Sequence, residues 1–128
     1  MMLRQHSVSI GEDFRRAMDM HDIDLLLSLY ADDAEIRIID KDHPPSAPRW
    51  MQGREAIARY YREMFARPIR HHVEEEVVGD DHLAFTEACE YPDGSRVFVS
   101  SVIELKNNLI YREVDVQAWD EKPPTKEM

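Results

Sequence analysis

The first half of the chain carries its hydrophobic residues at the spacing of α-helices. Apolar residues recur on one helical face from residue 10 to residue 18, and a leucine-rich face follows Asp22, a residue type that caps helix starts. The pattern predicts two helices that meet at a bend near residues 20–22, the second ending at Tyr30. A third amphipathic helix is predicted between Gly53 and Arg67.

The second half changes to the composition of β-strands. Four segments rich in branched and aromatic residues are separated by short turns that contain Gly, Asn or Asp: 69–78, 83–91, 96–105 and 109–119. Such turns predict an antiparallel meander. A shorter alternation at residues 34–38 predicts one more strand, whereas three prolines between residues 40 and 50 predict a loop. This order indicates an α+β fold with helices on one face of a bent sheet.

Composition narrows the class of protein. The chain has 128 residues and 43% hydrophobic residues, which suits one domain with a proper core. We expect a single domain over residues 1–120 and a disordered, proline-containing tail over 121–128. The formal charge of −10 argues against nucleic acid and against an anionic membrane surface as partners.

Cysteine content and hydrophobic runs bear on cofactors and location. Cys89 is the only cysteine, which excludes an intramolecular disulfide and argues against a cysteine-based zinc site. The pair Asp42 and His43 is too sparse to indicate a metal site, so we expect neither metal nor cofactor. The chain shows no apolar stretch typical of a secretion signal or a membrane span. These features favour a reducing, cytoplasmic setting.

The predicted sheet is half apolar on both faces. In the segment 96–105, one side carries Val97, Val99 and Ile103, and the other carries Phe98 and Val102. A sheet with one solvated face would alternate more cleanly. We therefore expect helices and a pocket on one side and a second copy of the chain on the other, giving a homodimer through the sheet. The alternative is that single exposed apolar residues need no partner.

Four short phrases, in this order along the chain, resemble the SnoaL-like branch of the nuclear-transport-factor-2-like superfamily. They are LYADDA at residues 29–34, GREAI at 53–57, VGDDHLA at 78–84 and LIYREVD at 109–115. The resemblance runs from about residue 10 to residue 120. It implies a conical barrel of a curved, mostly antiparallel sheet, with about three helices on its concave side and a pocket for a small molecule between them.

The resemblance also bears on chemistry. Members of the family include polyketide cyclases, ketosteroid isomerase, scytalone dehydratase and limonene epoxide hydrolase, together with proteins of no known activity. The enzymes commonly use a carboxylate in the pocket and no metal. Because one fold hosts many activities, the residues have to carry the functional argument.

Asp115 is the first catalytic candidate, because it matches an aspartate that many SnoaL-like sequences carry in their last strand. A carboxyl group in an apolar pocket has a raised pKa and can serve as acid or base. The strand pattern gives another interpretation, since Tyr111, Glu113, Asp115 and Gln117 share a polar face that would ordinarily meet solvent. Where many relatives have a histidine just before this aspartate, the chain has Glu113 and Val114, which weakens the case for a His–Asp pair within one strand.

His71 and His72 are adjacent on a predicted strand and point to opposite faces, so at most one can face the pocket. We take His72 as the second catalytic candidate, a proton shuttle that Asp115 could orient. The alternative is an exposed histidine whose charge offsets that of the acidic residues 74–76.

Seven residues are candidates for substrate binding: Tyr30, Arg37, Trp50, Tyr61, Phe65, Glu87 and Tyr111. Tyr30 or Tyr111 could donate a hydrogen bond to a substrate oxygen, and Arg37 could hold an anionic group. The other aromatic residues could form an apolar wall, and Glu87 could reach the cavity. Core packing for the aromatic residues, a surface ion pair for Arg37 and solvation of Glu87 are the alternatives.

Two functions follow as hypotheses. The first is an acid–base enzyme of the cyclase, isomerase, dehydratase or hydrolase kind, acting on a small, largely apolar molecule. The second is a non-catalytic dimeric module that binds a ligand or partner through the same cone. The enzyme predicts an enclosed pocket with ionisable groups within hydrogen-bond reach. The module hypothesis predicts a filled or shallow cavity and a solvent-exposed Asp115.

Overall fold

The computed structural model describes residues 6–121, and the three predicted helices are present within them. They are α1 (His6–Met20), α2 (Ile23–Ser28) and α3 (Arg54–Phe65). The predicted bend between the first two is confirmed: His21 has a φ of 54°, and the Asp22 side chain caps α2 by accepting a hydrogen bond from the Leu25 amide at 3.1 Å. None of the helices described is long and apolar enough to cross a membrane.

Six strands form one sheet, in the spatial order β2-β1-β6-β5-β4-β3. Their bounds are β1 (Tyr30–Ile39), β2 (Arg49–Gln52), β3 (Arg70–Val78), β4 (His82–Glu90), β5 (Arg96–Lys106) and β6 (Leu109–Trp119). All neighbours are antiparallel except β1 and β6, which are parallel. At the β5–β6 turn, Asn107 and Asn108 both take positive φ, of 53° and 64°, as a tight two-residue hairpin turn requires. The predicted α+β class and the meander are confirmed.

Two predicted boundaries are wrong. Tyr30 begins β1 and does not end the second helix, because pairing with β6 starts at once: the Ile110 amide donates to the Leu29 carbonyl at 2.8 Å. Residues 49–52 form the short strand β2, although the whole segment 40–50 was predicted as a loop. The three prolines lie before β2, which pairs only with β1 at the edge of the sheet, so they remove no hydrogen bond from the ladder.

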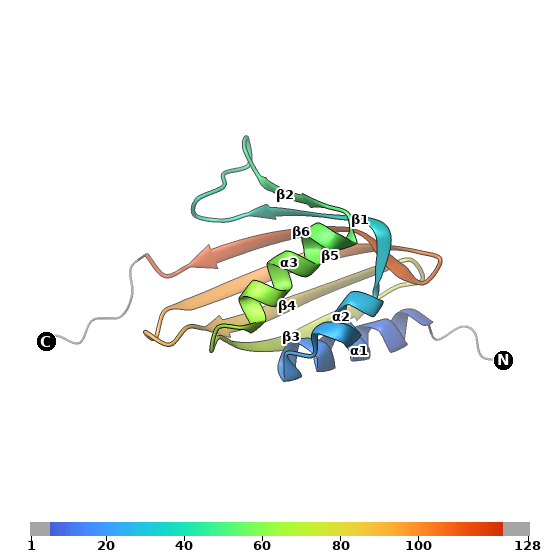
Figure 1. Ribbon diagram of the computed structural model, residues 1–128, viewed down its shortest axis with the longest axis horizontal. Coiled ribbons are helices and arrows are strands. Elements are labelled where there is room, and N and C mark those ends of the chain that lie inside the picture. Colours follow the sequence, from blue (N-terminus) through green and yellow to red (C-terminus); the bar gives the residue numbers. More distant parts are fainter. Residues whose placement is uncertain (1–5, 122–128) are drawn as a thin grey trace, which may run out of the picture.

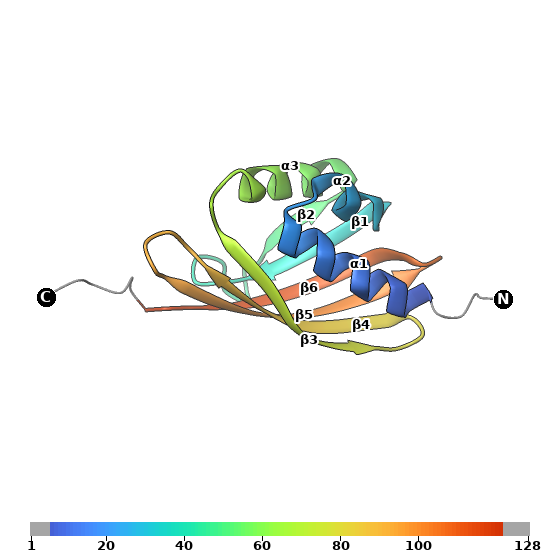
Figure 2. The same ribbon diagram turned by 90° about the horizontal axis from the view of Figure 1, so that it is seen from below.

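The three helices lie on the same side of the sheet, and the β1–β2 end of the sheet curls toward α3 (Figures 1 and 2). The core fills the space between these layers. Its fully buried residues include Phe14, Leu26, Ile36, Ile57, Leu83, Ile103 and Ile110. Each such side chain stabilises the fold by about 1.5–3 kcal/mol when it leaves water. This is the predicted curved sheet with helices on its concave side.

The strand β6 carries its polar residues inward. Glu113 and Asp115 are buried on the face toward the helices, whereas Val116 on the opposite face is 47% exposed. Because side chains alternate along a strand, this single orientation brings both acids to the concave side. The predicted tail over 121–128 lies, apart from its first residue, outside the described residues.

Candidate functional site

A cavity of about 240 Å³ lies between the helices and the concave face of the sheet. Helix residues from α1 and α3 form one wall, and the inward residues of β3 to β6 form the other. Its polar and ionisable lining includes Tyr60, Tyr61, His71, Glu87, Cys89, Ser101, Glu113 and Asp115. Apolar lining comes from Phe14, Met18, Met64, Phe85, Val97 and Val99. The cavity is therefore a recess of mixed polar and apolar lining, with buried acidic groups on its sheet side.

Glu113 and Asp115 form a carboxyl pair at the centre of this cavity. They are two residues apart on β6 and share its inward face, with exposed fractions of 1% and 6%. Tyr30 donates a hydrogen bond from its hydroxyl to Glu113 Oε1 at 2.6 Å. Ser101, directly opposite on β5, donates from Oγ to Asp115 Oδ1, also at 2.6 Å. Among the described residues, no ion pair involves either carboxyl.

The pKa values of the pair are raised and unequal. Burial and the neighbouring Asp115 charge raise the pKa of Glu113 well above its usual range. Burial raises the pKa of Asp115 to about 6, while hydrogen bonds from Glu113 and Ser101 oppose that rise. Two close carboxyl groups with no counter-cation do not both ionise readily. Near neutral pH, Glu113 therefore keeps the proton and donates it in a hydrogen bond to the Asp115 carboxylate.

Three phenol groups stand near the pair. Tyr60 and Tyr61 line the cavity, and the hydroxyl oxygens of Tyr30 and Tyr61 are 3.5 Å apart. Burial is the main cause that raises the pKa of each phenol. The three groups stay protonated and can donate hydrogen bonds. Tyr60 and Tyr61 are thus positioned to meet an oxygen of a bound molecule.

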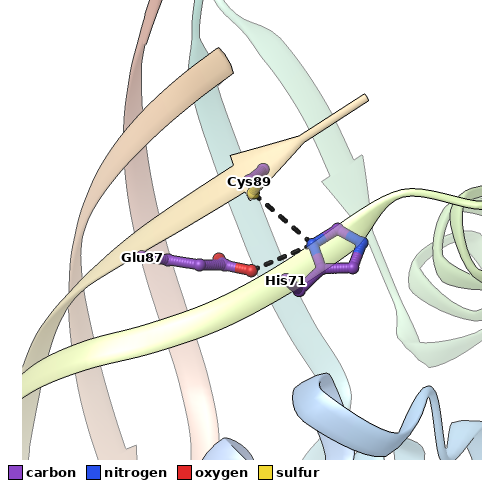
Figure 3. Close-up of side chains that lie close together, drawn as sticks. All are labelled: His71, Glu87 and Cys89. Atoms are coloured by element: carbon purple, nitrogen blue, oxygen red, sulfur yellow. Dashed lines mark hydrogen bonds and ion pairs between the residues drawn. The ribbon is translucent and has the colours of Figure 1, made fainter. Parts of the chain in front are cut away.

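His71, Glu87 and Cys89 form a second polar cluster on the cavity wall (Figure 3). His71 Nδ1 lies 3.1 Å from Glu87 Oε2 and 3.4 Å from Cys89 Sγ. All three side chains are buried, and burial followed by the Glu87 charge raises the pKa of the Cys89 thiol. The β3–β4 register sets His71 directly opposite Cys89, and Glu87 shares the face of Cys89 two residues earlier.

The loop before β2 borders the mouth of the cavity. Asp40, Asp42 and His43 line it, as does Arg49 at the start of β2. His43 Nδ1 lies 2.9 Å from Asp40 Oδ1, and the two residues form an isolated β-bridge. The Arg49 guanidinium stands over the Tyr60 ring at 5.0 Å. The first contact braces the loop internally, and the second joins the start of β2 to α3.

The structure brings together only some of the residues that the sequence singled out. Asp115, Tyr61 and Glu87 line the cavity, and Tyr30 lies beneath it as the partner of Glu113. Phe65 lies beside the cavity, its ring stacked on His21 at 4.8 Å between centroids.

Four predicted site residues lie away from the cavity. His72 points to the outer face, where its side chain is 67% exposed and lies 3.8 Å from Asp19. The inward histidine is His71, so the choice between the two must be corrected. Arg37 stacks over exposed Trp50, at 5.7 Å, on the outer side of β1 and β2. Tyr111 stacks instead with Lys106 at 4.8 Å, near the β5–β6 turn.

Sequence reasoning missed several residues of the cavity as site candidates. Glu113 could have been found, because it lies two residues before Asp115 and shares its face. Tyr60 could have been found from its place beside Tyr61 on an amphipathic helix. Ser101 and Cys89 carried no local signal, since their roles depend on the strand register alone.

Comparison with known proteins identifies one matching family and many solved structures with a similar fold. The model of the SnoaL-like domain family matches residues 12–113. A search of functionally curated proteins found no match. A nuclear-transport-factor-2-like protein of unknown function from Mesorhizobium loti has a TM-score of 0.80 and 19% identity, with 90% of this chain and 93% of that chain covered.

Two further solved structures carry names of enzymes. A candidate ketosteroid isomerase from Kribbella flavida has a TM-score of 0.75 and 15% identity, covering 96% of this chain and 85% of that one. A candidate polyketide cyclase from Sinorhizobium meliloti has a TM-score of 0.64 and 23% identity, covering 84% and 93%. At such identities these likenesses establish the fold alone.

Proposed function

Because the chain belongs to the SnoaL-like domain family, we propose that it is an acid–base enzyme that acts on a small, largely apolar molecule. The observation that carries this proposal is the carboxyl pair of Glu113 and Asp115, buried in the cavity and free of any ion pair among the described residues. A buried carboxyl pair with unequal pKa values is an arrangement suited to proton transfer near neutral pH.

The proposed step is removal of a proton from a carbon next to a carbonyl group. The Asp115 carboxylate takes the proton, so the carbon–hydrogen bond breaks and an oxygen–hydrogen bond forms. The electron pair moves onto the substrate oxygen as an enolate, and hydrogen bonds from Tyr60 or Tyr61 stabilise its charge. Asp115 then returns the proton to another carbon or to a leaving oxygen. Isomerisation and dehydration can both begin in this way.

Asp115 is the base in this proposal, and Glu113 is a positioning residue. Burial raises the pKa of Asp115 to about 6, so the group is ionised at neutral pH yet is a stronger base than an exposed aspartate. Protonated Glu113 holds one oxygen of Asp115, and Tyr30 in turn holds Glu113. This chain of hydrogen bonds fixes the carboxylate without neutralising it.

The cavity limits the substrate. Its volume of about 240 Å³ falls just below the ~300–1,000 Å³ of common ligand pockets. Buried acidic side chains line the sheet side of the cavity, which disfavours a carboxylate or phosphate placed against the sheet. We therefore favour a neutral ketone or enone with an apolar body. The alternative of a non-catalytic module predicts a filled cavity and an exposed Asp115, and the burial of Asp115 beside an open space supports the enzyme.

The test is hydrogen exchange at the reacting carbon, which needs no knowledge of the final product. Purified protein in D₂O is incubated with a panel of small cyclic ketones and enones, and loss of the α-proton signal is followed by NMR. We expect exchange of at least one class, and we expect D115N to slow it by about 10³-fold, within the range for a lost general base. The matched control is D33N, at an exposed position on β1.

The result that would overturn this proposal is equal exchange by D115N and the unchanged protein. Circular dichroism of both variants shows whether each remains folded. Since Asn is close to Asp in size and can still accept the Ser101 hydrogen bond, we expect D115N to keep the fold.

We also propose that the chain pairs with a second copy through the outer face of the sheet. Phe98, Val102 and Val116 are about half exposed there, on the adjacent strands β5 and β6. Such a contiguous apolar area favours a protein partner. Light scattering after size exclusion should give twice the chain mass, and V116K should reduce it. A monomer at all concentrations would contradict the pairing.

A further inference from the structure

We propose that His71, Glu87 and Cys89 form a binding site for one divalent transition-metal ion of the zinc type. The site lies on the wall of the cavity, apart from the carboxyl pair of β6. It goes beyond the proposed proton transfer, which uses no metal. An imidazole, a carboxylate and a thiolate are each established ligands of zinc.

The strands present the three side chains to one point. Glu87 and Cys89 are two residues apart on β4 and share its inward face. His71 on β3 is directly opposite Cys89 in the register. Figure 3 shows the imidazole Nδ1 turned toward both the carboxylate and the sulfur. Ligands on the paired strands of a sheet are held by the backbone ladder and do not depend on a mobile loop.

The distances fit a metal with little movement of the side chains. Tetrahedral zinc with ordinary bond lengths places its nitrogen, oxygen and sulfur ligands about 3.4–3.6 Å apart. The observed separations are 3.1 Å between His71 Nδ1 and Glu87 Oε2 and 3.4 Å between Nδ1 and Cys89 Sγ. All three ligand atoms lie within 4.8 Å of one another, so small shifts of these side chains would bring them to the spacing around one ion.

The charges of the cluster also favour an ion. Glu87 adds a third buried acidic side chain to a cavity that already holds Glu113 and Asp115. A divalent cation bound by one carboxylate and one thiolate makes the cluster neutral. On binding, the thiol proton leaves to solvent and the imidazole proton resides on Nε2.

The site has an open side. His71, Glu87 and Cys89 all line the cavity, so three protein ligands would leave the fourth position of the ion facing that space. This is the arrangement of zinc sites that bind water or a further ligand. The sequence prediction of no zinc site rested on the single cysteine, which excludes only sites built from several cysteines. A mixed ligand set from two strands carries no local motif.

Cobalt provides the test, because a thiolate bound to Co²⁺ gives a charge-transfer absorption in the near ultraviolet. Cys89 is the only cysteine in the chain, so this band can arise from no other residue. The full chain is freed of metal with a chelator, reduced, and titrated with CoCl₂. We expect the band to saturate at one equivalent per chain and to disappear when ZnCl₂ is added.

Variants assign the ligands. C89S should remove the charge-transfer band, and H71N and E87Q should each weaken cobalt binding at least 10-fold. H72N is the matched control, since His72 is the adjacent residue on the outer face, and its binding should be unchanged. Circular dichroism shows which variants are folded, and the band in the unchanged protein is decisive even if one variant is not.

The inference is overturned if the unchanged protein shows no thiolate band at saturating cobalt, or if C89S, H71N and E87Q bind cobalt as the unchanged protein does. Hydrogen exchange by chelator-treated protein separates this result from the proposed function. Proton transfer by the carboxyl pair should persist without metal, so either proposal can fail while the other stands.

Discussion

The two faces of β6 differ in polarity, and the arrangement is the reverse of the usual one. The polar face is covered by the helices, and the apolar face is the exposed one. The face toward the helices carries Glu113 and Asp115, whereas the face away from them carries Val114 and Val116. In an ordinary sheet with one solvated face, the apolar side is the covered side. The comparison teaches that a strand's buried side is decided by what the rest of the fold covers. Here the helices cover the polar side, and the cavity lies between them and that side.

The inner face tolerates its acids because their hydrogen-bonding groups have partners. Tyr30 and Ser101 each donate to one carboxyl, and one proton is shared between Glu113 and Asp115. An isolated buried carboxylate would cost several kcal/mol or would neutralise. In this pair one of the two carboxyl groups is neutralised, because Glu113 keeps its proton. The raised pKa values show that burial still disfavours the charged form of each group.

The largest expected effect contrasts two neighbouring residues of β5. Ile103 is fully buried on the inner face, and Val102 is 54% exposed on the outer face. We expect I103A to lower the free energy of unfolding by about 2–5 kcal/mol through the cavity it leaves. V102A should cost less than about 1 kcal/mol. Urea unfolding, at a concentration where the protein is monomeric, measures both. Equal costs would contradict the assignment of the faces.

The next effect is a pH-dependent stability that belongs to the inner face. The pKa of Asp115 is about 6 in the folded chain and near 3.8 when unfolded, so the folded state holds this proton more tightly. The free energy of unfolding therefore falls as pH rises from about 4 to about 6. D115N cannot ionise, and from pH 4 to pH 8 it should gain up to about 3 kcal/mol relative to the unchanged protein.

Urea unfolding of both proteins across this pH range measures the gain, with D33N as the control variant. A constant difference between D115N and the unchanged protein would mean that folding does not raise the pKa of Asp115.

The smallest effect compares two adjacent serines of β5. Ser101 donates to Asp115 on the inner face, whereas Ser100 is exposed on the outer face. The Ser101 hydrogen bond lowers the pKa of Asp115, so S101A should raise that pKa further. The exchange rate of the unchanged protein should fall as pH drops through about 6, and S101A should move this fall to higher pH. S100A should leave the profile in place.

The sequence was sufficient for most of the architecture and for part of the site, since the predicted residues Asp115, Tyr61 and Glu87 line the cavity. Helical spacing, turn residues and branched segments predicted every helix and the four-strand meander, because these signals are local. Asp115 came from family resemblance against the polarity of its own strand. His72 was chosen over His71 because nothing local says which side of a strand is covered. The strand register alone brings Ser101 to Asp115 and Cys89 to His71, and register is a property of the folded sheet.

A carboxyl-carbon NMR titration tests the central claim most directly. The chain is labelled with ¹³C at the side-chain carboxyl carbons of Asp and Glu, and D115N and E113Q assign the two resonances. The account predicts that Asp115 titrates near pH 6 and that Glu113 remains protonated well above its usual range. If both carboxyl groups instead titrate near pH 4, as groups in contact with water do, the buried pair and the function built on it are contradicted.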